Sequence, residues 1–216
     1  MVSTKDFILE NKVIVIVRKV YGEDLKNLAA ALYAGGVKMI ECTFDQADPD
    51  CIRKTSEAIR FLNDTYKGEM RFGAGTVLTV EQVEAAKAAG AEYIISPNVN
   101  DDVIRRTKEL GMVSMPGAMT PTEIMHAHDM GADLVKLFPA GYLGLSYVKD
   151  ITAPISHVKL VATGGVREDN FADWLKAGLV GAGISGRLCD RKCIAEGNFA
   201  EITRRAREFN RIAKEN

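Results

Sequence analysis

Apolar and polar positions along the chain follow two alternating patterns. Short runs of β-branched and other apolar residues, typical of buried strands, alternate with longer segments whose apolar residues recur at helical spacing. The short runs cover residues 13–17, 37–44, 71–77, 92–97, 112–117, 132–138, 158–165 and 180–186. Helical segments such as "EDLKNLAAALYAGG" and "TVEQVEAAKAAG" fill the intervals.

Several helical segments end in the same way, on a glycine that directly precedes the next apolar run. The phrases are "AAG-AEYI", "LG-MVSM", "MG-ADLV" and "AG-LVGA". Glycine favours the left-handed backbone that follows the end of a helix, so these residues predict helix C-termini. Regular alternation of strand and helix predicts parallel strands, because each helix must carry the chain back to the starting edge of the sheet.

Eight such units predict an α/β fold, a single-domain (β/α)8 TIM barrel over residues 1–216. The first ten residues would form a short N-terminal helix across the N-terminal end of the barrel. The alternative is an open doubly wound sheet. It is disfavoured because no GxGxxG motif follows the first strand and because eight strands are many for such a sheet.

Composition narrows the possible functions. A formal net charge of −1, with 47% hydrophobic and 26% charged residues, is typical of one globular core and argues against a nucleic-acid partner or a membrane surface. The first residues, "MVSTKDFILENK", do not read as a signal peptide. The four cysteines have no metal-ligand spacing, which favours reduced thiols. We therefore expect a cytoplasmic protein.

Strand side chains alternate between two faces, and one face of each barrel strand points inward. Glu41 and Thr43 share a face in the second run, and Leu134, Lys136 and Phe138 share one in the sixth. Enzymes with this fold place their chemistry where the strands end. Polar side chains are predicted at those C-terminal ends at Arg18, Glu41, Thr43, Thr76, Lys136 and Thr163.

The lysine in "ADLVKLF" is the strongest candidate for chemistry. Burial in apolar surroundings lowers the pKa of an amine, so that some of Lys136 would be neutral and able to add to a ketone. Glu41 on a facing strand could then transfer protons. The alternative is a structural ion pair between these two residues, but such pairs stabilise proteins poorly because both charges lose water.

Two glycine-rich stretches, "ATGGV" and "GAGISG", end the seventh and eighth runs. Loops at these positions form the usual phosphate site of barrel enzymes, since backbone N–H groups can approach an anion there. They predict phosphate binding at Gly164, Gly165, Ser185 and Gly186. The alternative is that these glycines only form tight turns.

The chain resembles the 2-keto-3-deoxy-6-phosphogluconate (KDPG) and 4-hydroxy-2-oxoglutarate (KHG) aldolase family over nearly its whole length. The motifs "GGVKMIECTF", "GAGTVLT", "AEYIISPNVN", "MPGAMTPTEI", "VKLFPA" and "VATGGV" carry the resemblance. It implies a class I aldolase that needs no metal or cofactor, binds a small keto acid or sugar phosphate, and assembles as a homotrimer.

The resemblance also implies roles for particular residues. Lys136 would form the Schiff base and Glu41 would be the general acid/base. Thr76 would help to hold the pyruvate carboxylate, and Pro97 and Phe138 would form the wall of the pocket. We add the inward-facing threonines as further substrate contacts, namely Thr43 and Thr163.

One position departs from the pattern of many family members, which carry an arginine for the substrate carboxylate two residues after the threonine of the second strand. Here that position is Asp45. Arg18, at the end of the first strand, is the candidate replacement because a guanidinium can bind a carboxylate through two hydrogen bonds. The alternative for Arg18 is a solvated surface residue.

The resemblance implies cleavage of KDPG to pyruvate and glyceraldehyde 3-phosphate, and also of 4-hydroxy-2-oxoglutarate to pyruvate and glyoxylate. A 2-keto-3-deoxy-6-phosphogalactonate (KDPGal) aldolase would share every residue named. A non-enzymatic sugar-phosphate-binding barrel would keep the glycines but would not need a reactive amine. Both remain alternatives, as does a glyoxylate-releasing aldolase that would not need the phosphate loops.

Overall fold

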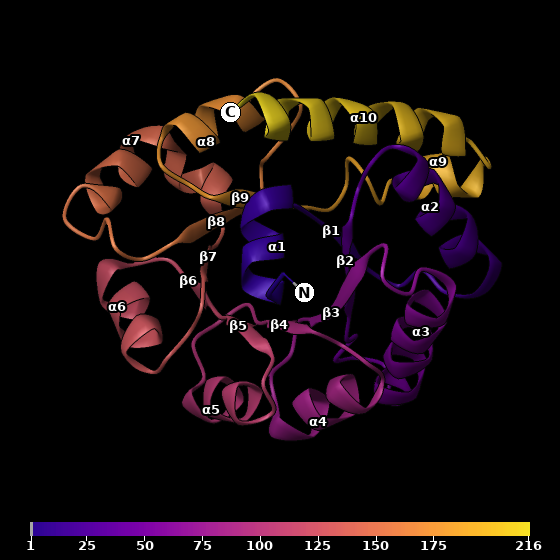
Figure 1. The fold of residues 1–216 in the computed structure, drawn as a ribbon, viewed down its shortest axis with the longest axis horizontal. Coiled ribbons are helices and arrows are strands. Elements are labelled where there is room, and N and C mark those ends of the chain that lie inside the picture. Colours follow the sequence, from indigo (N-terminus) through magenta and orange to yellow (C-terminus); the bar gives the residue numbers. More distant parts are fainter. Residues whose placement is uncertain (1) are drawn as a thin grey trace.

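The computed structural model describes residues 2–216, in which strands and helices alternate around a ring (Figure 1). The strands are β1 (Val13–Val17), β2 (Met39–Thr43), β3 (Arg71–Gly75), β4 (Tyr93–Ile95), β5 (Val113–Met115), β6 (Gly117–Ala118), β7 (Val135–Leu137), β8 (Leu160–Thr163) and β9 (Gly181–Ile184). The helices are α1 (Thr4–Asn11), α2 (Gly22–Ala34), α3 (Cys51–Thr65), α4 (Val80–Ala88), α5 (Asp101–Glu109), α6 (Pro121–Asp129), α7 (Ala140–Thr152), α8 (Phe171–Lys176), α9 (Arg191–Ala195) and α10 (Phe199–Glu215).

Within residues 2–216, the nine strands form one parallel sheet in the order β5-β4-β3-β2-β1-β9-β8-β7-β6. Its two end strands are consecutive in the chain, separated only by Pro116, so the sheet nearly closes into the predicted barrel. The fifth predicted run is thus two short strands. Its first half pairs with β4 and its second half with β7, and the intervening proline has no N–H to donate.

The predicted helix-ending glycines adopt the expected backbone. Gly90, Gly111, Gly131 and Gly178 have φ values of 93°, 70°, 93° and 104°. This left-handed conformation is strained for residues with a Cβ atom. The repeated helix–glycine–strand phrase therefore marks real element boundaries.

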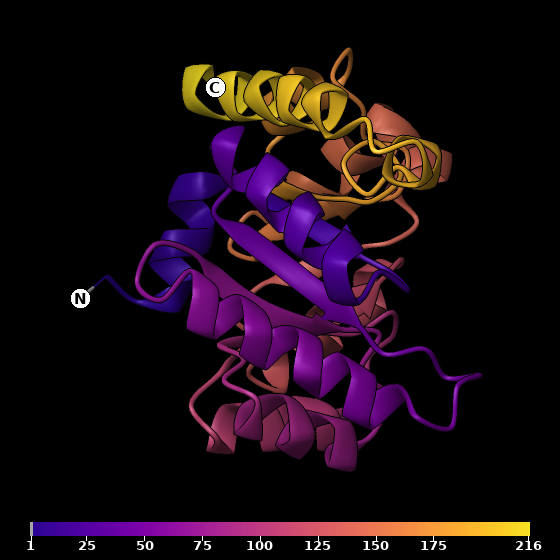
Figure 2. The ribbon, with the colours of Figure 1, turned by 90° about the vertical axis from the view of Figure 1, so that its right-hand side faces the viewer.

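The expected N-terminal helix is present as α1, and it covers the N-terminal end of the barrel (Figures 1 and 2). Ile8 is buried against side chains of the barrel interior. Arg71, at the start of β3, donates hydrogen bonds to Thr4 at 2.6 Å and to Glu92 at 2.8 Å. These contacts fasten α1 to the strand starts, so access to the interior is left to the opposite end.

Buried apolar residues form two clusters that follow the alternation of strand side chains. A large cluster lies between the strands and the helices and includes Val15, Ile40 and Val135. A smaller cluster inside the barrel includes Met39 and Tyr93. Because the smaller cluster fills the interior toward the N-terminal end, polar groups on the same faces are grouped toward the C-terminal end.

Candidate functional site

Lys136 is the middle residue of β7 and its side chain enters the barrel. Leu134, two residues earlier, belongs to the interior cluster, whereas Val135 and Leu137 pack in the cluster beneath the helices. Lys136 is only 8% exposed, and its Nζ lies 4.8 Å from the centre of the Phe138 ring. The predicted inward orientation of the lysine is confirmed.

Glu41 enters the barrel from β2 and is 2% exposed. Its Oε2 atom is buried and has no hydrogen-bond partner within residues 2–216. β3 leaves room for this carboxyl group, because a Cβ atom at Gly75 would lie 2.6 Å from Oε1 of Glu41. A buried carboxyl oxygen without a partner is costly in a folded protein, and it is a common mark of a functional group.

Burial shifts the pKa values of both residues toward their neutral forms. Removal of the carboxyl group from solvent raises the pKa of Glu41 to about 7, although the positive charges of Lys136 and Arg18 oppose the shift. The same cause lowers the pKa of Lys136; Glu41 opposes this shift and Arg18 reinforces it. A carboxyl group that titrates near neutral pH can both accept and donate protons, and a neutral amine is a nucleophile.

A cavity of about 520 Å³ opens beside Lys136 at the C-terminal end of the barrel. It is lined by residues from the ends of several strands and the loops that follow them. The predicted site residues that line it are Arg18, Thr76, Pro97, Lys136, Phe138, Thr163, Gly164, Gly165, Ser185 and Gly186. One hollow therefore brings together the lysine and both glycine-rich stretches.

Three residues discussed from the sequence are not part of the cavity wall. Glu41 lies buried beside it, and its charge and that of Lys136 influence each other's pKa. Thr43 is buried, and its hydroxyl donates to the carbonyl of Val17 at 3.3 Å. Asp45 forms an ion pair with Lys19 at 2.7 Å.

Sequence reasoning missed two arginines of the cavity, Arg167 and Arg187. Arg187 follows Gly186 directly, and Arg167 comes two residues after Gly165. Since both follow the glycine-rich ends of β8 and β9, their position after predicted anion loops was the signal that could have revealed them.

Thr76 has an unusual backbone that residues of a neighbouring loop and of α4 hold in place. Its φ value is +56°, a conformation that costs free energy in a residue with a β-branched side chain. Its carbonyl accepts a hydrogen bond from Gln46 at 2.7 Å, and Gln46 in turn accepts one from Gln82 at 2.9 Å. The two glutamines thus fix this edge of the cavity.

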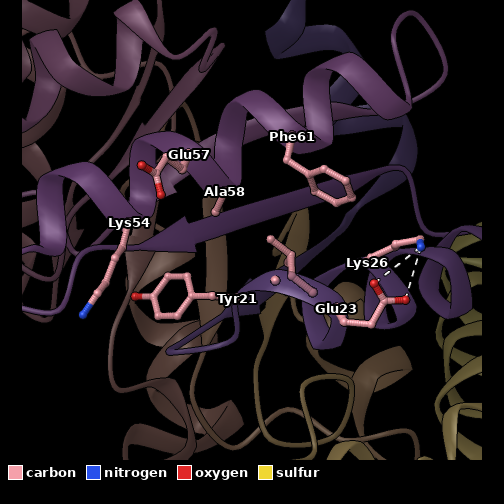
Figure 3. Close-up of a pocket in the computed structure, with 9 residues that line it drawn as sticks. Tyr21, Glu23, Lys26, Lys54, Glu57, Ala58 and Phe61 are labelled. Atoms are coloured by element: carbon pink, nitrogen blue, oxygen red, sulfur yellow. Dashed lines mark hydrogen bonds and ion pairs between the residues drawn. The ribbon is translucent and has the colours of Figure 1, made fainter.

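A second cavity, of about 430 Å³, lies outside the barrel between α2 and α3 (Figure 3). Apolar side chains such as Leu25 and Phe61 line it, together with charged groups that have partners of their own. Lys26 pairs with Glu23 at 3.2 Å, as Figure 3 shows, and Lys54 pairs with Asp48 at 2.6 Å. Its charged groups are satisfied and Lys136 is absent from its lining, so the barrel cavity is the better candidate.

Neither a metal centre nor a membrane span is apparent in the part of the chain that the structure describes. Residues 2–216 contain no cluster of three or more histidine, cysteine, aspartate or glutamate side chains arranged to hold a metal ion. No helix among these residues has both the length and the apolar character needed to cross a bilayer.

Comparisons with known proteins identify the family. The family model described as "KDPG and KHG aldolase" matches residues 5–205. The 2-dehydro-3-deoxy-6-phosphogalactonate aldolase of Escherichia coli is 37% identical over 161 residues, which are 74% of this chain and 78% of the relative. The 2-dehydro-3-deoxy-phosphogluconate aldolase of Treponema pallidum is 35% identical over 182 residues, 84% of this chain and 83% of the relative.

Among solved structures, a KDPG aldolase from Legionella pneumophila is similar with a TM-score of 0.85 and 28% identity. The match covers 96% of this chain and 98% of that one. That structure is described as holding pyruvate captured as a covalent carbinolamine intermediate. Carbinolamines form when an amine adds to a carbonyl group, the reaction for which a buried neutral lysine is suited.

Proposed function

Because the chain belongs to the KDPG and KHG aldolase family, we propose that it cleaves KDPG to pyruvate and glyceraldehyde 3-phosphate through a Schiff base on Lys136. The same chemistry extends to cleavage of 4-hydroxy-2-oxoglutarate to pyruvate and glyoxylate. The chain is thus an aldolase, an aldehyde-lyase. The observation that carries the proposal is a lysine only 8% exposed, with its amine at a cavity and a buried carboxyl group nearby.

In the proposed reaction, the neutral amine of Lys136 adds to the C2 carbonyl of the substrate, and loss of water gives a protonated imine. The carboxylate of Glu41 takes the proton of the C4 hydroxyl as the C3–C4 bond breaks and the aldehyde leaves. The electron pair of that bond moves toward the iminium and forms an enamine. Glu41 then protonates the enamine at C3, and water releases pyruvate and restores Lys136.

The remaining residues of the cavity have proposed binding roles. Thr76 and Arg18 bind the carboxylate of the pyruvate half, and the Phe138 ring covers the amine. Backbone N–H groups of the loops after β8 and β9 bind the distal phosphate, which is supported by φ values of 88° at Gly164 and 79° at Gly165. Thr163 lines the same cavity and is a further proposed substrate contact, whereas Thr43 does not line it and donates to the carbonyl of Val17 in β1.

A second candidate substrate is the phosphate of 2-keto-3-deoxygalactonate. The observation in its favour is the 37% identity to the Escherichia coli phosphogalactonate aldolase. The two substrates differ in configuration at C4, where the aldehyde half begins. Every catalytic role proposed above applies equally to both.

Parallel cleavage assays test the proposed function. The purified chain is given KDPG, KDPGal or 4-hydroxy-2-oxoglutarate, and the pyruvate released is measured. We expect KDPG to have the highest kcat/KM, with Lys136→Ala inactive on all three substrates. A higher kcat/KM on KDPGal would favour the second candidate, and no pyruvate from any substrate would overturn the proposal.

We further propose that the protein is a homotrimer in the cytoplasm. Tyr142 is 93% exposed and Met119 is 45% exposed, and this apolar surface supports burial against another copy. Light scattering after size-exclusion chromatography should give three times the chain mass, and a monomer would contradict it.

The four free cysteines suit a reducing compartment, and labelling in intact cells tests the location.

A further inference from the structure

The charge on the wall of the barrel cavity has one sign. Four charged residues line it, and all are basic: Arg18, Lys136, Arg167 and Arg187. Among residues 2–216, no aspartate or glutamate lines the same cavity. Such a surface concentrates anionic ligands and disfavours neutral ones. Lys136 has its own role in the chemistry, so the three arginines remain to be explained.

Arg187 stands out because its guanidinium is held in one orientation. Its Nε and Nη2 atoms each donate to Glu168 at 2.9 Å, a bidentate pair that joins the loop after β9 to the segment after β8. Glu168 is the more buried partner, with its side chain 18% exposed against 42% for Arg187. Neither bond uses Nη1, so the guanidinium keeps hydrogen-bond donors for another acceptor.

The backbone beneath Arg187 is fixed as well. The amides of Leu188 and Cys189 both donate to the carbonyl of Ser185, at 2.9 and 2.7 Å. Arg205 of α10 donates to the carbonyl of Arg187 at 3.2 Å. Arg205 also forms ion pairs with Asp190 at 2.8 Å and with Glu201 at 2.8 Å.

Arg167 is less constrained than Arg187. Its ion pair is with Asp169, two residues away, and both side chains are more than half exposed. An exposed local pair of this kind contributes little and does not fix a side chain. Arg187, next to Gly186, therefore has the better-defined position beside the predicted phosphate loops.

From this geometry we propose that Arg187, positioned by Glu168, determines specificity for an anionic group at the distal end of the substrate. The inference rests on the proposed aldolase function. Backbone amides form hydrogen bonds but carry no net charge, whereas a guanidinium is positively charged and can donate hydrogen bonds to two oxygens of a phosphate. Arg187 would thus favour phosphorylated substrates over the same sugar acids without phosphate.

Kinetics with paired substrates test this role. Wild type, Arg187→Ala and Arg187→Gln are assayed with KDPG and with the dephosphorylated sugar acid. Removing one charged hydrogen-bond donor should raise KM for KDPG by about 10- to 100-fold and change kcat little. KM for the dephosphorylated acid should stay within about twofold, and competitive inhibition by inorganic phosphate should weaken in parallel.

Arg207→Ala is the matched control, because it removes the same charge from an exposed position on α10 that does not line this cavity. It should behave as wild type. Equal losses on both substrates, or unchanged KM for KDPG in folded Arg187→Gln protein, would overturn the role of Arg187. Trapping of pyruvate on Lys136 with borohydride separates the two proposals, since it tests the aldolase function and does not involve the distal group.

Discussion

At the scale of single residues, the site depends on two side chains that burial makes unusually neutral. Oε2 of Glu41 has no hydrogen-bond partner within residues 2–216, and burial raises the pKa of this residue to about 7. Burial also lowers the pKa of Lys136 below its ordinary value. Neither shift would be expected if the two charges were simply attracted to each other, because mutual attraction stabilises both ionised forms. Desolvation has a larger effect on both pKa values than the attraction between the two charges. It gives the neutral amine and the proton-exchanging carboxyl group that the reaction needs, at a cost in stability.

The first prediction concerns the stability cost of Glu41. Its pKa rises from 4.5 to about 7 on folding, because the folded protein favours the neutral carboxyl group. The contribution of this group to the free energy of unfolding is therefore fully present below pH 4.5 and is lost as the pH rises through 7. Glu41→Gln stays neutral throughout. The variant should therefore exceed wild type in free energy of unfolding by about 3 kcal/mol at pH 8, with the difference vanishing near pH 4.

Urea unfolding at both pH values measures this difference, and aldol cleavage by the variant should fall by at least about 100-fold. Glu23→Gln, at an exposed carboxylate, is the control and should change stability by less than about 0.5 kcal/mol. A variant less stable than wild type at pH 8 would contradict the assignment of Glu41 as a buried, desolvated group.

The second prediction concerns the glycine that makes room for this carboxyl group. A Cβ atom at Gly75 would lie 2.6 Å from Oε1 of Glu41 and 3.0 Å from Cγ2 of Thr43. Gly75→Ala should lower the free energy of unfolding by about 1–3 kcal/mol and reduce kcat, because the carboxyl group must move.

Glu41→Asp shortens the side chain and should restore part of that stability in the Gly75→Ala background, without restoring activity. Thermal unfolding of the two single variants and the double variant gives the coupling. Strictly additive losses would mean that Gly75 and Glu41 do not share this space.

At the scale of elements, the pattern of apolar residues and glycines was sufficient to predict most of the fold. Gly90 and Gly131, for example, end helices with the expected left-handed backbone. The split of the fifth strand was not predicted, although Pro116 marks it, because the run around it remains apolar and reads as continuous. Pro116 has no N–H to donate to the sheet, but its carbonyl still accepts a hydrogen bond from the backbone N–H of Lys136.

Hydrogen bonds between side chains far apart in the sequence could not be predicted from the pattern of apolar residues. Gln46 and Gln82 are 36 residues apart and meet only once the sheet has formed. A polar side chain in a predicted loop or first helical turn is ordinarily solvent-exposed, yet Gln82 is buried. The support for Thr76 could therefore be found only in the structure.

The third prediction tests that support. Gln82→Met removes the bond to Gln46 and the acceptor for the amide of Leu78, which lies 2.8 Å from Oε1 of Gln82. Stability should fall by about 1–3 kcal/mol, and reaction of the protein with pyruvate should slow by about tenfold as Thr76 loses its fixed position.

The rate of adduct formation, trapped with borohydride at intervals, is the measurement. Gln82→Glu keeps the acceptor for Leu78 and should lose less stability than Gln82→Met. A folded Gln82→Met protein with the wild-type trapping rate would show that the glutamine pair does not position the site.

At the scale of the whole molecule, the nearly closed parallel sheet explains why distant parts of the sequence form one site. Parallel strands all end at the same side, so Lys136 and the loops after β8 and β9 meet around a single cavity. The number and alternation of predicted strands and helices were sufficient to predict that these residues lie at the same end of the barrel. The cationic character of the cavity was not predicted, although Arg167 and Arg187 follow the two glycine-rich stretches closely in the sequence.

Covalent trapping of pyruvate by the intact chain directly tests whether Lys136 forms a Schiff base. The protein is incubated with pyruvate and borohydride near pH 7, and the product is analysed by mass spectrometry and peptide mapping. If Lys136 forms the Schiff base, we expect one reduced pyruvate adduct per chain, located on Lys136 and absent from Lys136→Ala. An unmodified wild-type protein, or an adduct on another lysine that persists in Lys136→Ala, would contradict it.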